Sequence, residues 1–144
     1  MPRLFTGIKI PPAITEQLSF IQYGLPHARW IEPSDFHITL RFIGDIEDHI
    51  AADLADNLNT LSFAPFSLKL DSVGVFGGDK PRMVWAGVAA SEPLERLQLA
   101  HETLTQRLGL QAEGRKFTPH VTLARFKSRE RGDVSSYLFD HARF

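Results

Sequence analysis

The chain has 144 residues, of which 43% are hydrophobic and 23% charged, and its net charge is −1. These values are ordinary for a globular protein. A net charge so close to zero excludes the class of protein that coats nucleic acid through its overall electrostatic field. Cysteine is absent, which excludes a disulfide framework, a thiolate nucleophile and a Cys-based zinc site. We find neither a signal peptide nor the ~20 apolar residues of a membrane span, so we expect a soluble cytoplasmic protein with no membrane partner.

The first half of the chain predicts two strand–helix pairs. Segment 3–10 is apolar and β-prone and is ended by two prolines, which indicates a strand. Apolar residues over 14–25 then recur at helical spacing. Segment 36–43 alternates apolar and polar residues as a half-buried strand does, and 46–61 returns to the helical period.

The second half predicts a similar order of elements. It consists of a strand over 66–76, a turn over 77–81, a strand over 83–90, a helix over 91–109, a strand over 117–126 and a short helix over 134–139. Two β-α-β units of similar length, one in each half, favour an α+β fold with a pseudo-two-fold pair of lobes. We therefore expect a single domain over 1–144 in which two histidine-bearing strands face each other across a cleft.

Those two strands carry the same four-residue pattern, His-x-Thr-Leu. The first reads FHITLRF over 36–42, and the second reads FTPHVTLARF over 117–126. Because side chains alternate between the faces of a strand, His37 and Thr39 share a face with Arg41, opposite the apolar residues. His120 and Thr122 share a face in the same way.

Two details complicate the pattern. Strict alternation would place Arg125 with the apolar residues, so either the strand ends or bulges before Arg125, or this arginine has a different role from Arg41. A third match, His101-Glu-Thr-Leu104, lies in the helical segment, and we interpret it as a coincidence on a solvated helix face. The strand setting and the matching positions of the other two copies, rather than the four letters alone, point to function.

A pair of imidazoles facing one centre can divide acid and base work near neutral pH. Two threonine hydroxyls can donate hydrogen bonds to the non-bridging oxygens of a phosphate. In-line attack on a phosphodiester fits this set without a protein nucleophile or a metal ion. A single strand histidine is more often a surface or hydrogen-bonded residue, and threonine is a common strand former, so the argument depends on the pair.

The motifs and their surroundings resemble one known family. HITL at 37–40 and HVTL at 120–123 resemble the paired signatures of the 2H phosphoesterase superfamily. The stretches RLFTGIKIPP, HITLRFIGDI, VGVFGG, PRMVWAGV and FTPHVTLARF are similar to its RNA 2′,3′-cyclic phosphodiesterase branch, once called 2′-5′ RNA ligases. The similarity runs from about Arg3 to Phe126. Family members usually continue past the second motif with a helix and further strands, so this chain stops roughly a strand pair earlier.

The resemblance implies a bilobal α+β fold, with two antiparallel sheets lining a V-shaped cleft and helices on the outer faces. It also implies metal-independent hydrolysis of a terminal 2′,3′-cyclic phosphate to a 2′-phosphate, with no cofactor. By this analogy His37 is the proton donor to the leaving 3′-oxygen, His120 is the proton acceptor from water, and Thr39 and Thr122 bind the phosphate. The expected partner is an RNA terminus or a nucleotide 2′,3′-cyclic phosphate, and the expected state is a monomer.

Other residues near the motifs are candidate substrate contacts. Arg41 and Arg125 could reach RNA phosphates, and Phe76 could stack on a base. Trp30 and Trp85 could also stack, although two of these three aromatic residues are expected in the core. The basic segment 115–131 fits either an RNA-binding rim or a solvated surface.

Three other functions remain open at this stage. The same site could join RNA ends through a 2′,5′-linkage, because a 5′-hydroxyl can replace water in the reverse reaction. The chain could instead be a non-catalytic module that binds an RNA end or a nucleotide. A metal site built on the histidine pair is the weakest alternative, because the sequence places no third ligand beside the pair.

Overall fold

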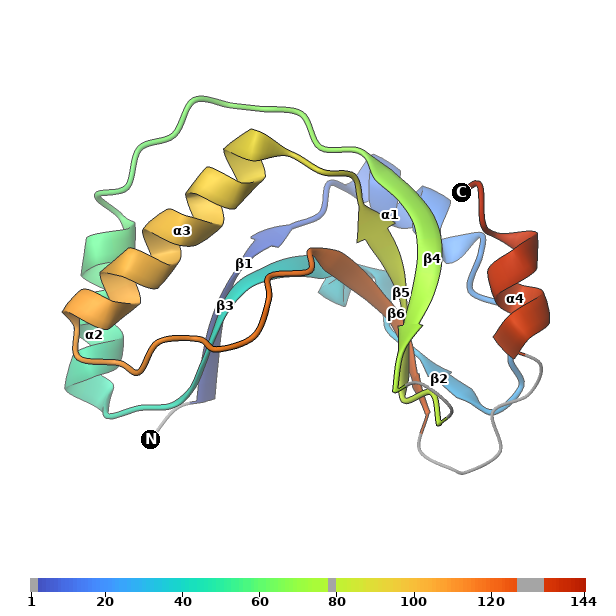
Figure 1. The fold of residues 1–144 in the computed structure, drawn as a ribbon, viewed down its shortest axis with the longest axis horizontal. Coiled ribbons are helices and arrows are strands. Elements are labelled where there is room, and N and C mark those ends of the chain that lie inside the picture. The colour runs from blue at the N-terminus through green and yellow to red at the C-terminus, as the bar shows by residue number, and fades with distance from the viewer. Residues whose placement is uncertain (1–2, 78–79, 127–133) are drawn as a thin grey trace. The chain divides into compact units, whose positions relative to one another are not determined.

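Figure 1 shows a computed structural model of the chain, which describes residues 3–77, 80–126 and 134–144. The strands are β1 (Arg3–Lys9), β2 (Ala28–Trp30), β3 (His37–Asp45), β4 (Leu70–Phe76), β5 (Met83–Val88) and β6 (His120–Phe126). The helices are α1 (Pro12–Ser19), the 3-10 turn η1 (Pro33–Asp35), α2 (Asp48–Leu58), α3 (Glu92–Arg107) and α4 (Val134–Asp140). The predicted α+β class is confirmed. Within the described residues, no helix is long and apolar enough to cross a membrane.

The strands are hydrogen-bonded in the order β1-β3-β6-β5-β4, and β2 also pairs with β6. The pairings of β6 with β2, β3 and β5, and of β4 with β5, are antiparallel. The chain divides into two compact units. Unit 1 comprises Met1–Ile8, Thr39–Leu68 and Ala90–Thr118, and unit 2 comprises Lys9–Ile38, Lys69–Ala89 and Pro119–Phe144. Each unit combines segments from both halves of the chain, and the single domain over 1–144 stays a prediction.

Sequence patterns located most elements, with errors at their ends. Helix α1 ends at Ser19, six residues before the end of its predicted segment. Strand β6 begins at His120 rather than 117, and the preceding Pro119 has no N–H with which to extend a ladder. The three-residue elements β2 and η1 were not predicted, because such short segments carry no readable period.

Unit 2 buries one face of its strands completely. Val84, Ala86, Val121 and Leu123 have no exposed surface. Around this core, Trp30 of β2 lies 6.0 Å from the ring of Tyr137 of α4, measured between ring centroids. The Tyr137 hydroxyl donates to the backbone carbonyl of Ile21, just after α1, so α4 is fastened to the segment that follows α1.

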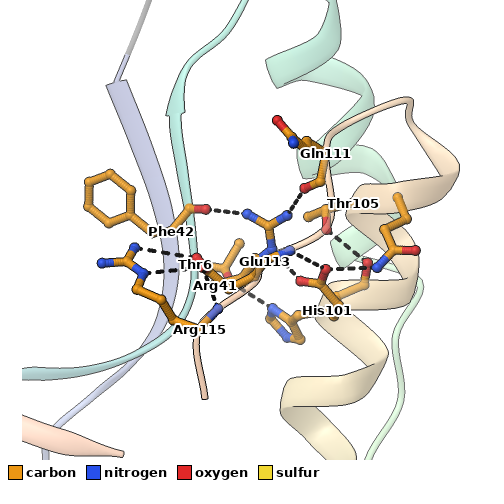
Figure 2. A network of polar contacts seen from close by, with 10 residues as sticks. Thr6, Arg41, Phe42, His101, Thr105, Gln111, Glu113 and Arg115 are labelled. Atoms are coloured by element: carbon orange, nitrogen blue, oxygen red, sulfur yellow. Dashed lines mark hydrogen bonds and ion pairs between the residues drawn. The ribbon is translucent and has the colours of Figure 1, made fainter. Parts of the chain in front are cut away.

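Unit 1 contains α2 and α3 and most of β1 and β3, and it buries an ion pair. Figure 2 shows Arg41 of β3 at the centre of a polar network. Its three guanidinium nitrogens donate to the Glu102 carboxylate and to the backbone carbonyls of Phe42 and Gln111. The sequence pattern placed Arg41 on the open face and Phe42 on the packed face, and this was wrong. Arg41 is only 6% exposed and Phe42 is 42% exposed, because Glu102 and two carbonyls compensate the buried charge.

Glu102 is held in its ionised form by its neighbours. Burial alone would raise the pKa of Glu102, but hydrogen bonds from the Gln106 side chain, the Glu113 N–H and Arg41, together with the Arg41 charge, lower it. Removing one partner of such a buried pair typically costs about 3–5 kcal/mol, because the other charge is left uncompensated. This network therefore fixes β3 against α3 and the loop that follows it.

His101 of α3 lies in the same unit and is buried, so its expected position on a solvated helix face was wrong. Its Nδ1 atom is 2.9 Å from Oγ1 of Thr6 in β1, as Figure 2 shows. Burial lowers the pKa of His101, which keeps the ring neutral in the folded protein. Because the unfolded chain then binds a proton more readily, His101 contributes stability above its unfolded pKa that is lost as the pH falls below it.

We expect the free energy of unfolding to decrease as the pH falls from 7 to 5, and part of that decrease to come from His101. The variant His101→Asn keeps an amide near Thr6 but cannot titrate. It should be less stable at pH 7 and lose less stability on acidification, as measured by urea unfolding at several pH values. His49→Asn, at an exposed position of α2, is the matched control for loss of an imidazole, and the slope of His101→Asn should be the smaller of the two. A His101→Asn slope equal to that of the wild type would contradict this account.

Gly74 of β4 makes room for an aromatic ring of β5. It lies directly opposite Trp85 in the β4–β5 register. A Cβ added at Gly74 would lie 2.4 Å from Cη2 of Trp85, well inside contact distance. The missing side chain therefore leaves the space at Gly74 to the indole.

Gly74→Ala should destabilise the protein by about 1–3 kcal/mol, the usual cost of overpacking, because the indole has to move. Urea unfolding measures this change directly. Gly114→Ala is the matched control, since an added Cβ there meets nothing within 4 Å. Equal stability of the Gly74→Ala variant and the wild type would show that the indole is not held in this position.

Candidate active site

The two histidine motifs meet at the point where β3 and β6 begin. Ile38 pairs with Val121 in antiparallel register, and both side chains are buried. Their neighbours in sequence point to the opposite face. Continuing the register by one residue places His37 directly across from Thr122 on that face.

The same register brings the two imidazoles of unit 2 together. His120 is two residues before Thr122 on β6, so it is the diagonal neighbour of His37. Diagonal neighbours in an antiparallel pair are about 7–8 Å apart, which long side chains can span. Both histidines are half-buried, so their rings are partly accessible. The arrangement suits two rings that act on one phosphate-sized group.

The ring of His37 is oriented by the turn before β3. Its Nδ1 atom lies 2.8 Å from the backbone carbonyl oxygen of Asp35, the last residue of η1. A carbonyl oxygen only accepts hydrogen bonds, so Nδ1 carries a proton and Nε2 is the nitrogen that gains or loses one. The short turn that the sequence did not reveal therefore sets the tautomer of His37.

The ring of His120 lies against two aromatic side chains. Its centroid is 5.0 Å from that of Phe76, with the two planes nearly perpendicular at 88°. The Trp85 centroid is 6.0 Å away, and Phe76 and Trp85 contact each other at 5.3 Å. Across the strand pair, His120 lies opposite Gly87, which has no side chain to compete for the space. Aromatic packing thus restricts the ring.

The two threonines have different surroundings. The Thr122 hydroxyl donates to the sulfur of Met83 at 3.4 Å. A thioether is a weak acceptor, so a phosphate oxygen can readily replace it as the acceptor of this hydrogen bond. Thr39 is half-buried on β3 and is the first residue of its segment in unit 1, two residues after His37.

A β-bulge determines to which face of β6 the side chain of Arg125 points. Val84 of β5 pairs with Ala124, whereas the next residue, Trp85, pairs with Thr122, so β6 contains one extra residue at Leu123. Leu123 and Ala124 are both fully buried, and Arg125 is exposed. The bulge, one of the alternatives that the sequence left open, is confirmed. It returns Arg125 to the face of His120 and Thr122.

The remaining candidates are placed as follows. Phe76 lies beside His120, whereas the guanidinium of Arg41 is occupied by the unit 1 network. Trp30 packs on Tyr137, and Arg115 pairs with Glu113 on the surface of unit 1. Residues 127–131 of the basic segment lie outside the described residues. The substrate roles of Phe76, Arg41 and Arg125 stay predictions.

Sequence reasoning missed several neighbours of the motifs. Asp35 acts through its backbone carbonyl, which no residue type reveals. Met83 was not singled out, and Trp85 was named only as a candidate for base stacking; the β5–β6 register shows them opposite Arg125 and Thr122. Among the residues that the structure describes, no group of three His, Asp or Glu side chains could hold a metal ion.

The chain is similar to known phosphoesterases in sequence. A sequence model described as LigT like Phosphoesterase matches residues 8–85 and 88–144. The RNA 2′,3′-cyclic phosphodiesterase of Aquifex aeolicus is 36% identical over 144 residues, which cover 94% of this chain and 77% of the relative. The enzyme of the same name from Aeropyrum pernix is 36% identical over 129 residues, covering 81% and 73%.

Solved structures agree with the sequence comparison. E. coli LigT in its apo form matches with a TM-score of 0.76 and 27% identity, covering 88% of this chain and 73% of LigT. LigT complexed with 3′-AMP matches with a TM-score of 0.75 and 28% identity, covering 85% and 72%. The resemblance inferred from the paired motifs is confirmed: the chain belongs to the LigT-like phosphoesterase family.

Proposed function

We propose that this protein hydrolyses the 2′,3′-cyclic phosphate of RNA ends or nucleotides to a 2′-phosphate. The observation that carries the proposal is the β3–β6 register, in which His37 lies across from Thr122 and diagonal to His120. Relatives that cover most of the chain are named RNA 2′,3′-cyclic phosphodiesterase, and the related LigT has been crystallised with 3′-AMP. Both support the same substrate class.

The proposed reaction is one in-line displacement. His120 takes a proton from water, the water oxygen attacks phosphorus, and the bond from phosphorus to the 3′-oxygen breaks. His37 gives its Nε2 proton to that 3′-oxygen, which leaves a 3′-hydroxyl and a 2′-phosphate. Thr39 and Thr122 donate to the non-bridging oxygens. Afterwards His37 regains a proton and His120 loses one, so the two rings return to their starting forms.

The two rings are held in different ways. The Asp35 carbonyl accepts from Nδ1 of His37, which leaves Nε2 as the nitrogen that can give a proton to the leaving oxygen. His120 instead packs against Phe76 and Trp85.

Incubation with a nucleoside 2′,3′-cyclic phosphate in excess EDTA should yield the nucleoside 2′-phosphate, which phosphorus NMR distinguishes from the 3′ isomer. His37→Ala and His120→Ala should each lower kcat by about 10²- to 10⁴-fold, the usual contribution of one acid or base. His49→Ala, on an exposed face of α2, is the matched control and should turn over normally. Activity that needs a metal ion, or that survives both histidine substitutions, would exclude the proposed mechanism.

The pH dependence of kcat/KM assigns the roles. The wild type should give a bell-shaped profile, because the base must be neutral and the acid protonated in the same molecule. His120→Ala should lose the acidic limb, since no base remains to be protonated, and His37→Ala should lose the alkaline limb. The opposite pattern would show that the two histidines act in exchanged roles.

A further inference from the structure

Arginine side chains lie on the same strand face as the proposed catalytic histidines. Along β5, Met83, Trp85 and Gly87 alternate with buried residues and so point to one face. Their partners on β6 are Arg125, Thr122 and His120. Arg125 therefore shares a face with the site residues of unit 2.

Strand β2 adds a second arginine at the same point. Arg29 pairs directly with Arg125 in the antiparallel β2–β6 register, so the two side chains leave the sheet next to each other. Both are exposed, and neither has a carboxylate partner among the residues that the structure describes. Like charges directly opposite each other on two strands destabilise the pair, so this arrangement favours an anion that bridges them.

The distance along β6 indicates which anion. Thr122 and Arg125 are three residues apart, about 10 Å in an extended strand and less with the bulge between them. That separation suits a second phosphate, one nucleoside away from the first. In a 3′-terminal nucleotide with a 2′,3′-cyclic phosphate, this second group is the phosphate on the 5′-oxygen.

We propose that Arg29 and Arg125 form a subsite for the 5′-phosphate of the terminal nucleotide. This inference rests on the proposed function and narrows its substrate class. The preferred substrate is then an RNA end, or a nucleotide with a 5′-phosphate, rather than a bare nucleoside 2′,3′-cyclic phosphate. The β-bulge at Leu123 is the structural device that gives Arg125 this role.

The test compares kcat/KM for three substrates that share one terminal nucleoside 2′,3′-cyclic phosphate. The first has a free 5′-hydroxyl, the second a 5′-phosphate, and the third is a dinucleotide. We expect the second and third to exceed the first by about 10- to 100-fold, the range of charge-assisted hydrogen bonds. For the dinucleotide, log kcat/KM should also fall more steeply with log salt, by about 0.7 for one phosphate contact.

The double substitution Arg29→Gln and Arg125→Gln should bring the three substrates close to the same kcat/KM and remove the additional salt dependence. Arg96→Gln, an exposed arginine of α3 that pairs with Glu92, is the matched control and should keep the preference. Circular dichroism and urea unfolding establish that each variant is folded.

Three outcomes would overturn the subsite. One is equal turnover of all three substrates by the wild type. Another is a preference that appears only with the dinucleotide, since this would indicate recognition of a second base. A third is a preference that survives the double substitution in a folded protein. Failure of the wild type to hydrolyse any of the three would instead reject the proposed function itself, and the subsite with it.

Discussion

The pairing of Ile38 with Val121 is the constraint on which the site depends. Both side chains are buried, and a slip of one residue would move each of them to the opposite face and turn the histidines into the core. Burial of this pair therefore fixes the relation between His37, Thr122 and His120 more firmly than any polar contact could. Burial of these two core residues sets the strand register, and the register aligns the side chains that carry the chemistry.

Supporting residues then refine what the register establishes. A backbone carbonyl orients His37, and two aromatic rings pack against His120. Gly74 and Gly87 contribute by lacking side chains, because the indole of Trp85 occupies the space above both. Unit 1 is stabilised differently, by the buried Arg41–Glu102 pair and the Thr6–His101 contact.

The sequence could predict the helices, the longer strands and the two motifs, because each is defined by a hydrophobic period or a short sequence motif that depends only on nearby residues. It misplaced Arg41 because the partner that makes its burial tolerable, Glu102, is 61 residues away. The same limit explains His101, whose partner Thr6 lies 95 residues away. The face to which Arg125 points depended on a bulge that only the pairing with β5 defines. Strand β2, which supplies Arg29, is too short to show a sequence pattern. In each case the missing information was a contact between distant parts of the chain.

The composition of the two units has a consequence for how the protein is made. Unit 1 needs Ala90–Thr118 and unit 2 needs Pro119–Phe144, in addition to segments synthesised much earlier. Neither unit can therefore be completed while the ribosome is still working on the first half. The apolar faces of the early segments stay uncovered until the later segments are synthesised. Contacts between residues so far apart in sequence also slow folding once the chain is released. The interleaved architecture thus prolongs the time for which apolar segments of the nascent chain are uncovered.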